Sequence, residues 1–151
     1  MRAARRAGPA HAAPAEIALR LLMLSWASLH TSANTLAHAL LRLPASARAL
    51  RAERAPPAQR PLLGSFLKEV LRVDMVGAGA FSRKVMRRGG HTFSSGLAVP
   101  GGTYVCVAAR EAHLAVGAEF DAARYVDGGK DVGVTATSDT FMSFGGGSHA
   151  W

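Results

Sequence analysis

The sequence predicts a mainly helical fold with a small β region, an α+β class, and three observations support this class. Apolar residues recur every three or four positions over residues 15–43 and again over residues 62–73, as on one face of a helix. Between residues 91 and 107, short β-prone runs are separated by turns that contain glycine or proline. With 151 residues, of which 49% are hydrophobic, the chain has the size and composition of one ordinary domain.

The first helix is expected over residues 15–43. Its apolar stripe is interrupted near the middle by polar residues that include His30 and Thr31. Polar groups inside a helix compete for backbone hydrogen bonds and need partners, so this interruption faces either solvent or a pocket. Pro44 is expected to end the helix and to open a second one that continues to about residue 53, because proline fits the first turn of a helix and not its interior.

Another helix is expected over residues 62–73, after a linker that contains several prolines. Its Glu69 and Arg72 lie three positions apart, so their side chains can share one face. Such a pair usually decorates an exposed surface and contributes little to stability. Whether this pair has a functional role depends on the other motifs around it in the sequence.

The β region is expected to contain a strand over residues 103–107, paired with its neighbour across the turn at residues 100–102. Residues 108–114 are expected to form one or two helical turns. The single cysteine, Cys106, lies in the apolar run and is expected to be a buried, inert thiol. No long periodic element follows Gly117.

The net charge of +8 raises nucleic acid or an anionic membrane as a partner. Residues 1–80 carry 11 basic and four acidic side chains, whereas residues 81–151 carry seven and six. No aromatic residues are interleaved with the arginines, so solvated helical faces explain the charge better than a stacking platform for bases. We therefore expect no nucleic-acid partner, and a basic nucleic-acid-binding module stays as an alternative.

Residues 1–14 form a basic, alanine- and arginine-rich segment that we expect to be disordered. The apolar run that follows, at residues 21–29, is shorter than the ~20 residues that a bilayer requires. We expect no membrane span in this chain. The histidines include no pair four positions apart, so a zinc site is not indicated.

Taken in order, several motifs resemble the C-terminal half of a cytochrome P450, a haem-thiolate monooxygenase of the filamentous-fungal type. The resemblance covers residues 15–151 and implies a single partial cytochrome P450 domain that extends from the central long helix to the haem-binding loop. The motifs are the oxygen-binding segment of the central helix (residues 27–32), the Glu-x-x-Arg helix (67–72), the β region (82–85 and 96–103), the meander arginine (120–124) and the haem-binding loop (144–150).

The resemblance implies roles for two residues in oxygen activation and for three residues in an ion network. Thr31 and His30 would serve oxygen activation and proton delivery, with His30 able to relay protons near neutral pH. Glu69 and Arg72 would join Arg124 in a largely buried ion network, in which the loss of one partner is costly.

The resemblance also implies haem as the cofactor and five residues that would bind it. Arg83 and His149 would face the haem propionates as charge partners. Phe144 would pack near the thiolate, while Gly145 and Gly147 would let the backbone approach the haem.

One departure from the family pattern concerns the iron ligand. Trp151 occupies the position expected for the cysteine ligand, and an indole N–H only donates. Because thiolate donation drives O–O cleavage in this family, we expect the chain alone to be inactive and assign no metal ligand. The region before the central helix, with the membrane anchor and most of the substrate pocket, has no counterpart in these residues.

For the full-length family, the resemblance implies an NADPH-dependent reductase and a small organic substrate as partners. It also implies a location at the endoplasmic reticulum membrane. A second hypothesis is a non-enzymatic remnant or an incorrect gene model.

Overall fold

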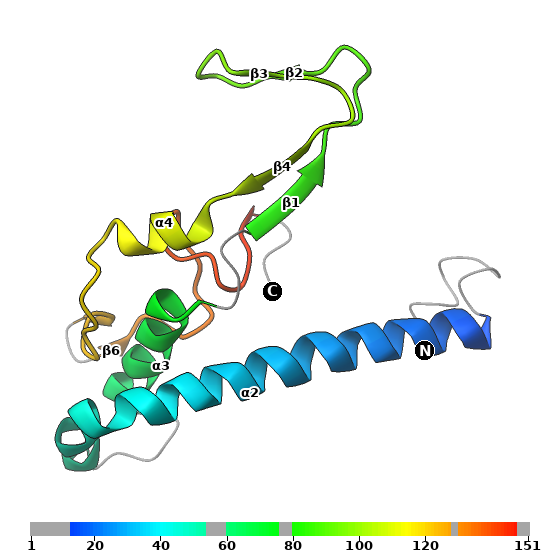
Figure 1. The fold of residues 1–151 in the computed structure, drawn as a ribbon. Helices are drawn as coiled ribbons and strands as arrows, with labels where there is room; N and C mark the ends of the chain where they lie inside the picture. Colours follow the sequence, from blue (N-terminus) through cyan, green and yellow to red (C-terminus); the bar gives the residue numbers. More distant parts are fainter. Residues whose placement is uncertain (1–12, 54–59, 76–79, 128–129, 148–151) are drawn as a thin grey trace.

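The computed structural model describes residues 13–53, 60–75, 80–127 and 130–147. Over these residues the chain is mainly helical with three small antiparallel pairs of strands, which confirms the predicted fold class (Figure 1). Most of the segment 1–14 that was expected to be disordered lies outside them. The elements are α2 (Pro14–Ala52), α3 (Pro61–Val73), β1 (Ala80–Lys84), β2 (His91–Thr92), β3 (Ala98–Val99), β4 (Tyr104–Val107), α4 (Ala109–Leu114), β5 (Val126–Asp127) and β6 (Lys130–Asp131).

Helix α2 is a single helix of 39 residues, with Pro14 in its first turn and Pro44 inside it. The prediction that Pro44 ends one helix and opens another was wrong. Pro44 is exposed, so water can solvate the carbonyl group that loses its usual N–H partner. The proline therefore bends the helix and does not end it. The ribbon of α2 indeed changes direction in its last turns (Figure 1). Half-buried Leu50, beyond the proline, packs against the core and holds these turns in place.

Helix α3 packs against the C-terminal half of α2 and forms the centre of the structure. Ala39 of α2 and Phe66 and Val70 of α3 make up the buried apolar cluster. A two-pronged ion pair joins the same helices, because Arg42 Nε and Nη2 each lie 2.9 Å from a carboxylate oxygen of Asp74. This pair fixes where α2 crosses the end of α3.

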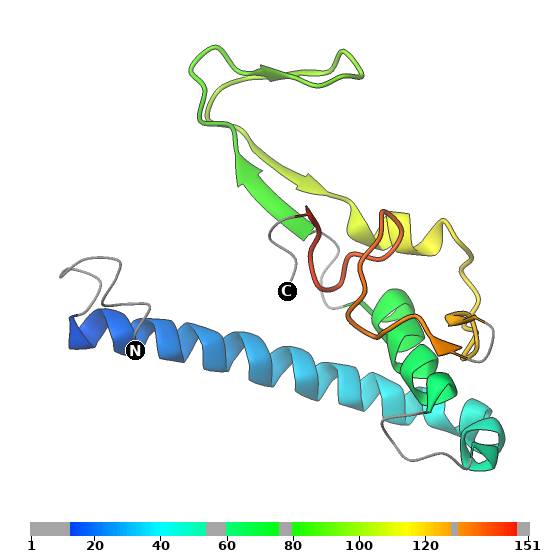
Figure 2. The ribbon, with the colours of Figure 1, turned by 180° about the vertical axis from the view of Figure 1, so that it is seen from behind.

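Strands β1 and β4 form a ribbon that points away from the helices and leads to the short β2–β3 hairpin (Figures 1 and 2). The expected pairing across the turn at residues 100–102 was wrong: β4 pairs with β1, and β3 pairs with β2. The reason lies in the glycines of that turn. A side chain on Gly101 would meet the carbonyl oxygen of Arg87 at 2.5 Å, and the N–H of Gly102 donates to Val85. The turn therefore packs against residues 85–88 and directs the chain back along β1.

The predicted helical turns at residues 108–114 are confirmed as α4. Cys106, in contrast, is exposed on β4 and is not the buried thiol that was expected. Within the described residues the sheet that contains it has two strands, so the side chains of its outer face meet solvent.

The N-terminal half of α2 exposes large apolar side chains around much of its circumference. Leu22, Trp26 and Leu29 are 65%, 61% and 69% exposed. A helix that is apolar on several sides is normally covered by other elements. No helix among the described residues is long and apolar enough to cross a membrane.

We predict that the 151-residue chain self-associates through this half of α2. Replacing Leu22 and Leu29 together by glutamine, which has a similar helix propensity, should shift the chain toward monomer in sedimentation velocity. A control with Ser25→Gln and His30→Gln changes two exposed polar positions of the same helix and should leave the association unchanged. Equal association of the two double variants would contradict the prediction.

Candidate functional site

The face of α3 that points away from α2 is polar and yet buried. Ser65, Lys68, Glu69 and Arg72 are each at most 2% exposed. Their spacing of three or four residues places them on one side of the helix. Buried polar and charged groups are tolerated only when they are hydrogen-bonded, so the partners of these side chains define the site.

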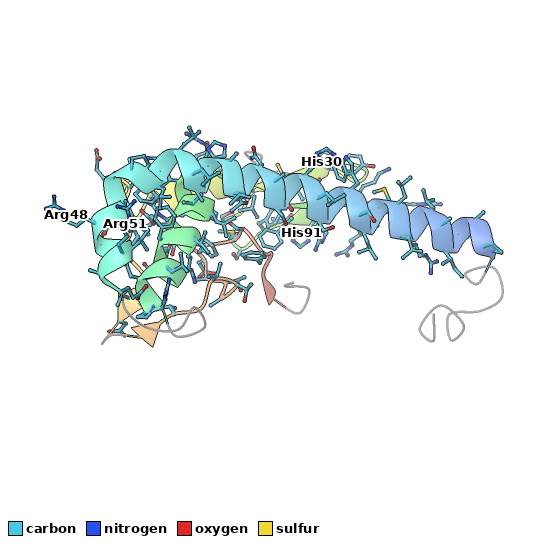
Figure 3. All side chains as sticks on the ribbon, turned by 90° about the horizontal axis from the view of Figure 1, so that it is seen from below. His30, Arg48, Arg51 and His91 are labelled. Carbon is cyan, nitrogen blue, oxygen red and sulfur yellow. The ribbon has the colours of Figure 1, made fainter. Side chains whose placement is uncertain are left out.

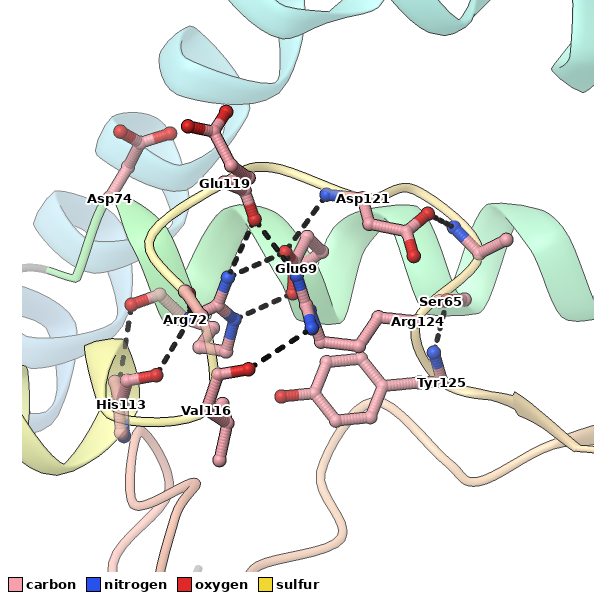
Figure 4. A network of polar contacts seen from close by, with 12 residues as sticks. Ser65, Glu69, Arg72, Asp74, His113, Val116, Glu119, Asp121, Arg124 and Tyr125 are labelled. Atoms are coloured by element: carbon pink, nitrogen blue, oxygen red, sulfur yellow. Dashed lines mark hydrogen bonds and ion pairs between the residues drawn. The ribbon is translucent and has the colours of Figure 1, made fainter.

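The centre of the site is a carboxylate held by two arginines (Figure 4). Arg72 Nε and Nη2 donate to the two oxygens of Glu69 at 2.7 Å each, in the forked geometry that a guanidinium and a carboxylate share. Arg124 Nε donates to Glu69 Oε1 at 3.0 Å, as does the backbone N–H of Asp121. The structure thus brings together the three residues of the expected ion network, although they are up to 55 residues apart in the chain.

Arg72 also binds the backbone at the end of α4 and in the segment that follows it. Its guanidinium donates to the carbonyl oxygens of His113, Gly117 and Glu119, at 2.7, 2.6 and 3.1 Å. Together with the two oxygens of Glu69, these acceptors match the five N–H donors of an arginine. Gly117 adopts a φ of 130°, a left-handed conformation that favours glycine. The segment therefore closes on Arg72 with no donor left over.

The charges of the pair support each other. Burial alone would raise the pKa of Glu69, but hydrogen bonds from Arg72, the Asp121 N–H and Arg124 outweigh it and lower the pKa below its ordinary value. The hydrogen bond to Glu69 raises the pKa of Arg72, against the effect of burial. Both groups are therefore charged at neutral pH. Among the described residues, no buried side-chain nitrogen or oxygen lacks a partner.

Three further residues of α3 hold the chain beyond residue 124. Lys68 Nζ donates to the carbonyl oxygens of Gly133 and Ala136 at 2.9 and 2.7 Å. The same ammonium lies 4.8 Å from the ring centre of Tyr125 and 4.6 Å from that of Phe141. The Ser65 hydroxyl accepts from the N–H of Tyr125, and the carbonyl oxygen of Leu71 accepts from Ser143.

Sequence reasoning missed these anchors. The signal that could have found Lys68 and Ser65 is the polar stripe itself, because Ser65, Lys68 or Glu69, and Arg72 recur at helical spacing. The partners gave no signal, since most of them are backbone carbonyl groups that any residue type can supply.

A cleft of about 630 Å³ lies between α2, the opposite face of α3, and residues 143–144. Thr31 lies on one side of it and Phe144 on the other, so the structure brings two of the predicted site residues to one cavity. The lining is mostly apolar, with hydroxyl groups from α2. It consists of Ala27, Ser28, Thr31, Ser32, Thr35, Leu36, Leu67, Leu71, Met75, Val134, Ser143 and Phe144.

Thr31 and its neighbour His30 occupy different sides of α2. The Thr31 hydroxyl donates to the carbonyl oxygen of Ala27 at 2.6 Å, one turn earlier in the helix. His30 is exposed, and its ring contacts the ring of Trp26 edge to face. In Figure 3, His30 projects from one edge of α2, and residues 133–147 lie beyond the other edge. The structure does not bring His30 to the cleft.

The predicted haem-contacting residues are not all gathered at the cleft. Arg83 is exposed on β1, where its guanidinium donates to the neighbouring carbonyl of Ser82. Gly145 and Gly147 have φ values of 88° and 63° and give the loop after Phe144 its sharp turns. The prediction for His149, and the position of Trp151, lie outside the described residues.

The exposed arginines at the C-terminal end of α2 also lie apart from the cleft. Figure 3 shows Arg48 and Arg51 there, and both are exposed. No aromatic side chain interleaves with them in the sequence, which is typical of a solvated helix face.

Comparison with known proteins identifies the fold to which this scaffold belongs. The cytochrome P450 monooxygenase AtmP of Aspergillus flavus is 36% identical over 159 residues, which cover 91% of this chain and 30% of that protein. The cytochrome P450 monooxygenase penP of Penicillium crustosum matches to the same extent. The chain is homologous to part of a cytochrome P450 monooxygenase.

A solved structure agrees with this assignment at the level of the fold. A zebra fish cytochrome P450, determined with progesterone, superposes with a TM-score of 0.65 at 22% identity. The match covers 84% of this chain and 32% of that one. No family model matches the chain. The chain spans about 30% of the length of the fungal cytochrome P450 relatives.

The residues that line the cleft suit the macrocycle of a haem, but they do not include a cysteine ligand for its iron. A largely apolar cleft of about 630 Å³ suits a flat apolar macrocycle and lies within the roughly 300–1,000 Å³ of ordinary ligand pockets. Protein ligands of haem iron are cysteine, histidine, methionine or tyrosine. Of the lining residues only Met75 belongs to these types, and Cys106 lies on β4. The described residues therefore offer walls for a haem, and none of those that line the cleft is a cysteine.

We predict that Arg72→Ala lowers the free energy of unfolding by about 3–5 kcal/mol, because it leaves the buried Glu69 carboxylate with too few partners. Arg72→Lys should also destabilise, since an ammonium cannot reach all the acceptors of the guanidinium. Urea unfolding in the Leu22→Gln/Leu29→Gln background gives the measurement. Arg48→Ala, at an exposed position, is the matched control and should change the value by no more than about 0.5 kcal/mol. Equal urea midpoints for Arg72→Ala and Arg48→Ala would contradict the buried network.

Proposed function

We propose that this chain is the section of a haem-dependent monooxygenase that builds one side of the haem cleft and the support behind it. The observation that carries the proposal is the double use of α3. Its Leu67 and Leu71 line the cleft, whereas Glu69 and Arg72, on the opposite face, fix the chain between residues 113 and 124. The parent activity would insert one atom of dioxygen into an organic substrate.

The residues of this chain would serve that activity by shaping the cleft. Haem, when bound, supplies the oxygen chemistry. Thr31 would present its hydroxyl to the cleft, since the hydroxyl can turn from its bond to Ala27 toward a ligand. Phe144 would cover the opposite side and exclude water. Arg83 is exposed on β1 and offers a cation for a carboxylate such as a haem propionate.

We propose further that the 151 residues alone do not catalyse the reaction. Their single cysteine is Cys106, which is exposed on β4 and does not line the cleft. A whole protein of this family would add the partners that the resemblance implies, an NADPH-dependent reductase and a small organic substrate, at the endoplasmic reticulum membrane. The same position of Cys106 supports the alternative, a non-enzymatic remnant.

The cleft is tested by haem titration of two neighbouring variants. Thr31→Trp fills the cleft and should weaken haem binding, followed by the Soret band, by about tenfold or more. His30→Trp adds the same group on the other side of α2 and should leave the affinity unchanged. If the two tryptophans have equal effects, haem does not bind in this cleft.

The missing thiolate is tested by the spectrum of the reduced, carbon-monoxide-bound complex. We predict that the chain with haem gives no thiolate-type Soret band, because the cleft offers no cysteine. The variant Cys106→Ser should give the same spectrum as the wild type. A thiolate-type band in the wild type, whether or not it disappears in Cys106→Ser, would contradict the prediction.

A further inference from the structure

A buried histidine whose imidazole takes no part in the ion network joins three parts of the chain. His113 is 0% exposed in the last turn of α4. Its Nε2 lies 2.7 Å from the backbone nitrogen of Met142, and its Nδ1 lies 3.3 Å from the carbonyl oxygen of Arg72. A backbone N–H can only donate, so Nε2 accepts and has no proton. The neutral tautomer with its proton on Nδ1 then donates to the carbonyl of Arg72 and satisfies both contacts.

The surroundings hold the imidazole ring in this orientation. The Arg72 guanidinium donates to the carbonyl oxygen of His113 at 2.7 Å, so each residue binds the backbone of the other. The ring of Phe141 stacks on the imidazole, with ring centres 5.4 Å apart and planes 8° apart. The imidazole is thereby fixed by α3, by its own helix α4, and by the segment that begins at Phe141.

We propose that His113, as the neutral imidazole, is a positioning residue that holds the segment 142–147 in place at the cleft. Met142 is two residues before Phe144, which lines the cleft, and the intervening Ser143 donates to the carbonyl of Leu71. The hydrogen bond from Met142 to His113 therefore sets where Phe144 emerges. We call the hydrogen bond between Met142 and His113 the latch. The consequence for haem rests on the proposed function, whereas the latch exists without any ligand.

Protonation would open this latch. A proton on Nε2 would face the N–H of Met142, because Nε2 would change from an acceptor to a donor. The Nε2–H group and the N–H of Met142 would then both lack an acceptor. Arg72 on α3 is the cation that contacts His113 directly. Phe141, which stacks on the imidazole, also contacts the Lys68 ammonium and the ring of Tyr125. On α4 itself, Arg110 and Glu111 are exposed. This environment disfavours an imidazolium.

The direction of the pH effect follows from these contacts. Burial lowers the pKa of His113 from its ordinary value of 6.5; the hydrogen bond to the Arg72 carbonyl acts against this, and the Arg72 charge adds to it. A base whose pKa is lower in the folded state stabilises that state fully above the unfolded pKa. The stabilisation is lost as the pH falls below 6.5 toward the folded value. The latch is therefore closed at neutral pH and opens on acidification.

Amide hydrogen exchange at Met142 in the full chain tests the proposal without haem. Corrected for the intrinsic rate, protection of this amide in the wild type should fall about tenfold or more between about pH 7.5 and pH 5. In His113→Gln, whose side-chain oxygen accepts a hydrogen bond and does not titrate, protection should persist at both pH values. In His113→Phe, which keeps the stacking on Phe141 and has no acceptor, it should be low at both.

Two controls separate the latch from general unfolding. Amides of α3 such as Val70 should stay protected in both variants, and His91→Gln, at an exposed position on β2, should behave as the wild type. Unchanged protection of Met142 in His113→Phe, or no change with pH in the wild type, would overturn the proposal. If a variant also loses protection of the α3 amides, the pH dependence of Met142 exchange in the wild type tests the proposal in its place. A failure of haem to bind the cleft would leave these exchange rates as they are and would count only against the proposed function.

Discussion

A carboxylate and a guanidinium lie side by side on one face of α3 with no exposed surface, and most of the surrounding chain is arranged to make this possible. Removing two charges from water costs several kcal/mol for each ion and is offset only when every donor and acceptor is satisfied. Glu69 alone cannot satisfy Arg72, which has five donors. The remaining donors bind the carbonyls of His113, Gly117 and Glu119, so the need of one side chain sets the path of a whole segment.

The network has this influence because the apolar core is small. Among the described residues, three form the buried cluster between α2 and α3, and much of the apolar surface of α2 is exposed. Apolar packing is non-directional and would tolerate several placements of the segment after α4. Hydrogen bonds from Arg72, Lys68 and His113 are directional and select one. In this part of the molecule, polar contacts specify the arrangement more than apolar burial does.

The sequence could predict what depends on local pattern. Helical periodicity located α3 and α4, and the spacing of Glu69 and Arg72 indicated a shared face. The continuation of α2 through Pro44 could not be predicted, because an exposed proline allows a bend in place of an end. The pairing of β4 with β1 depends on how closely Gly101 approaches a distant backbone. Lys68 and His113 were missed for the same physical reason, since backbone carbonyl and amide groups up to 68 residues away have no residue signature.

The cleft shows how a local polar network can position residues that lie far from it. The hydroxyl of Thr31 bonds to carbonyl groups within α2, and Thr31 lies 11 positions before Arg42, or about 16 Å along the helix at 1.5 Å per residue. Its place is set by the rigidity of α2 and by the two-pronged pair between Arg42 and Asp74 at the end of α3. Phe144, on the other side, depends on His113 and Ser143. The positions of both walls of the cleft therefore depend on α3. A change in the polar face of that helix should alter the width of the cleft, although the polar face does not line it.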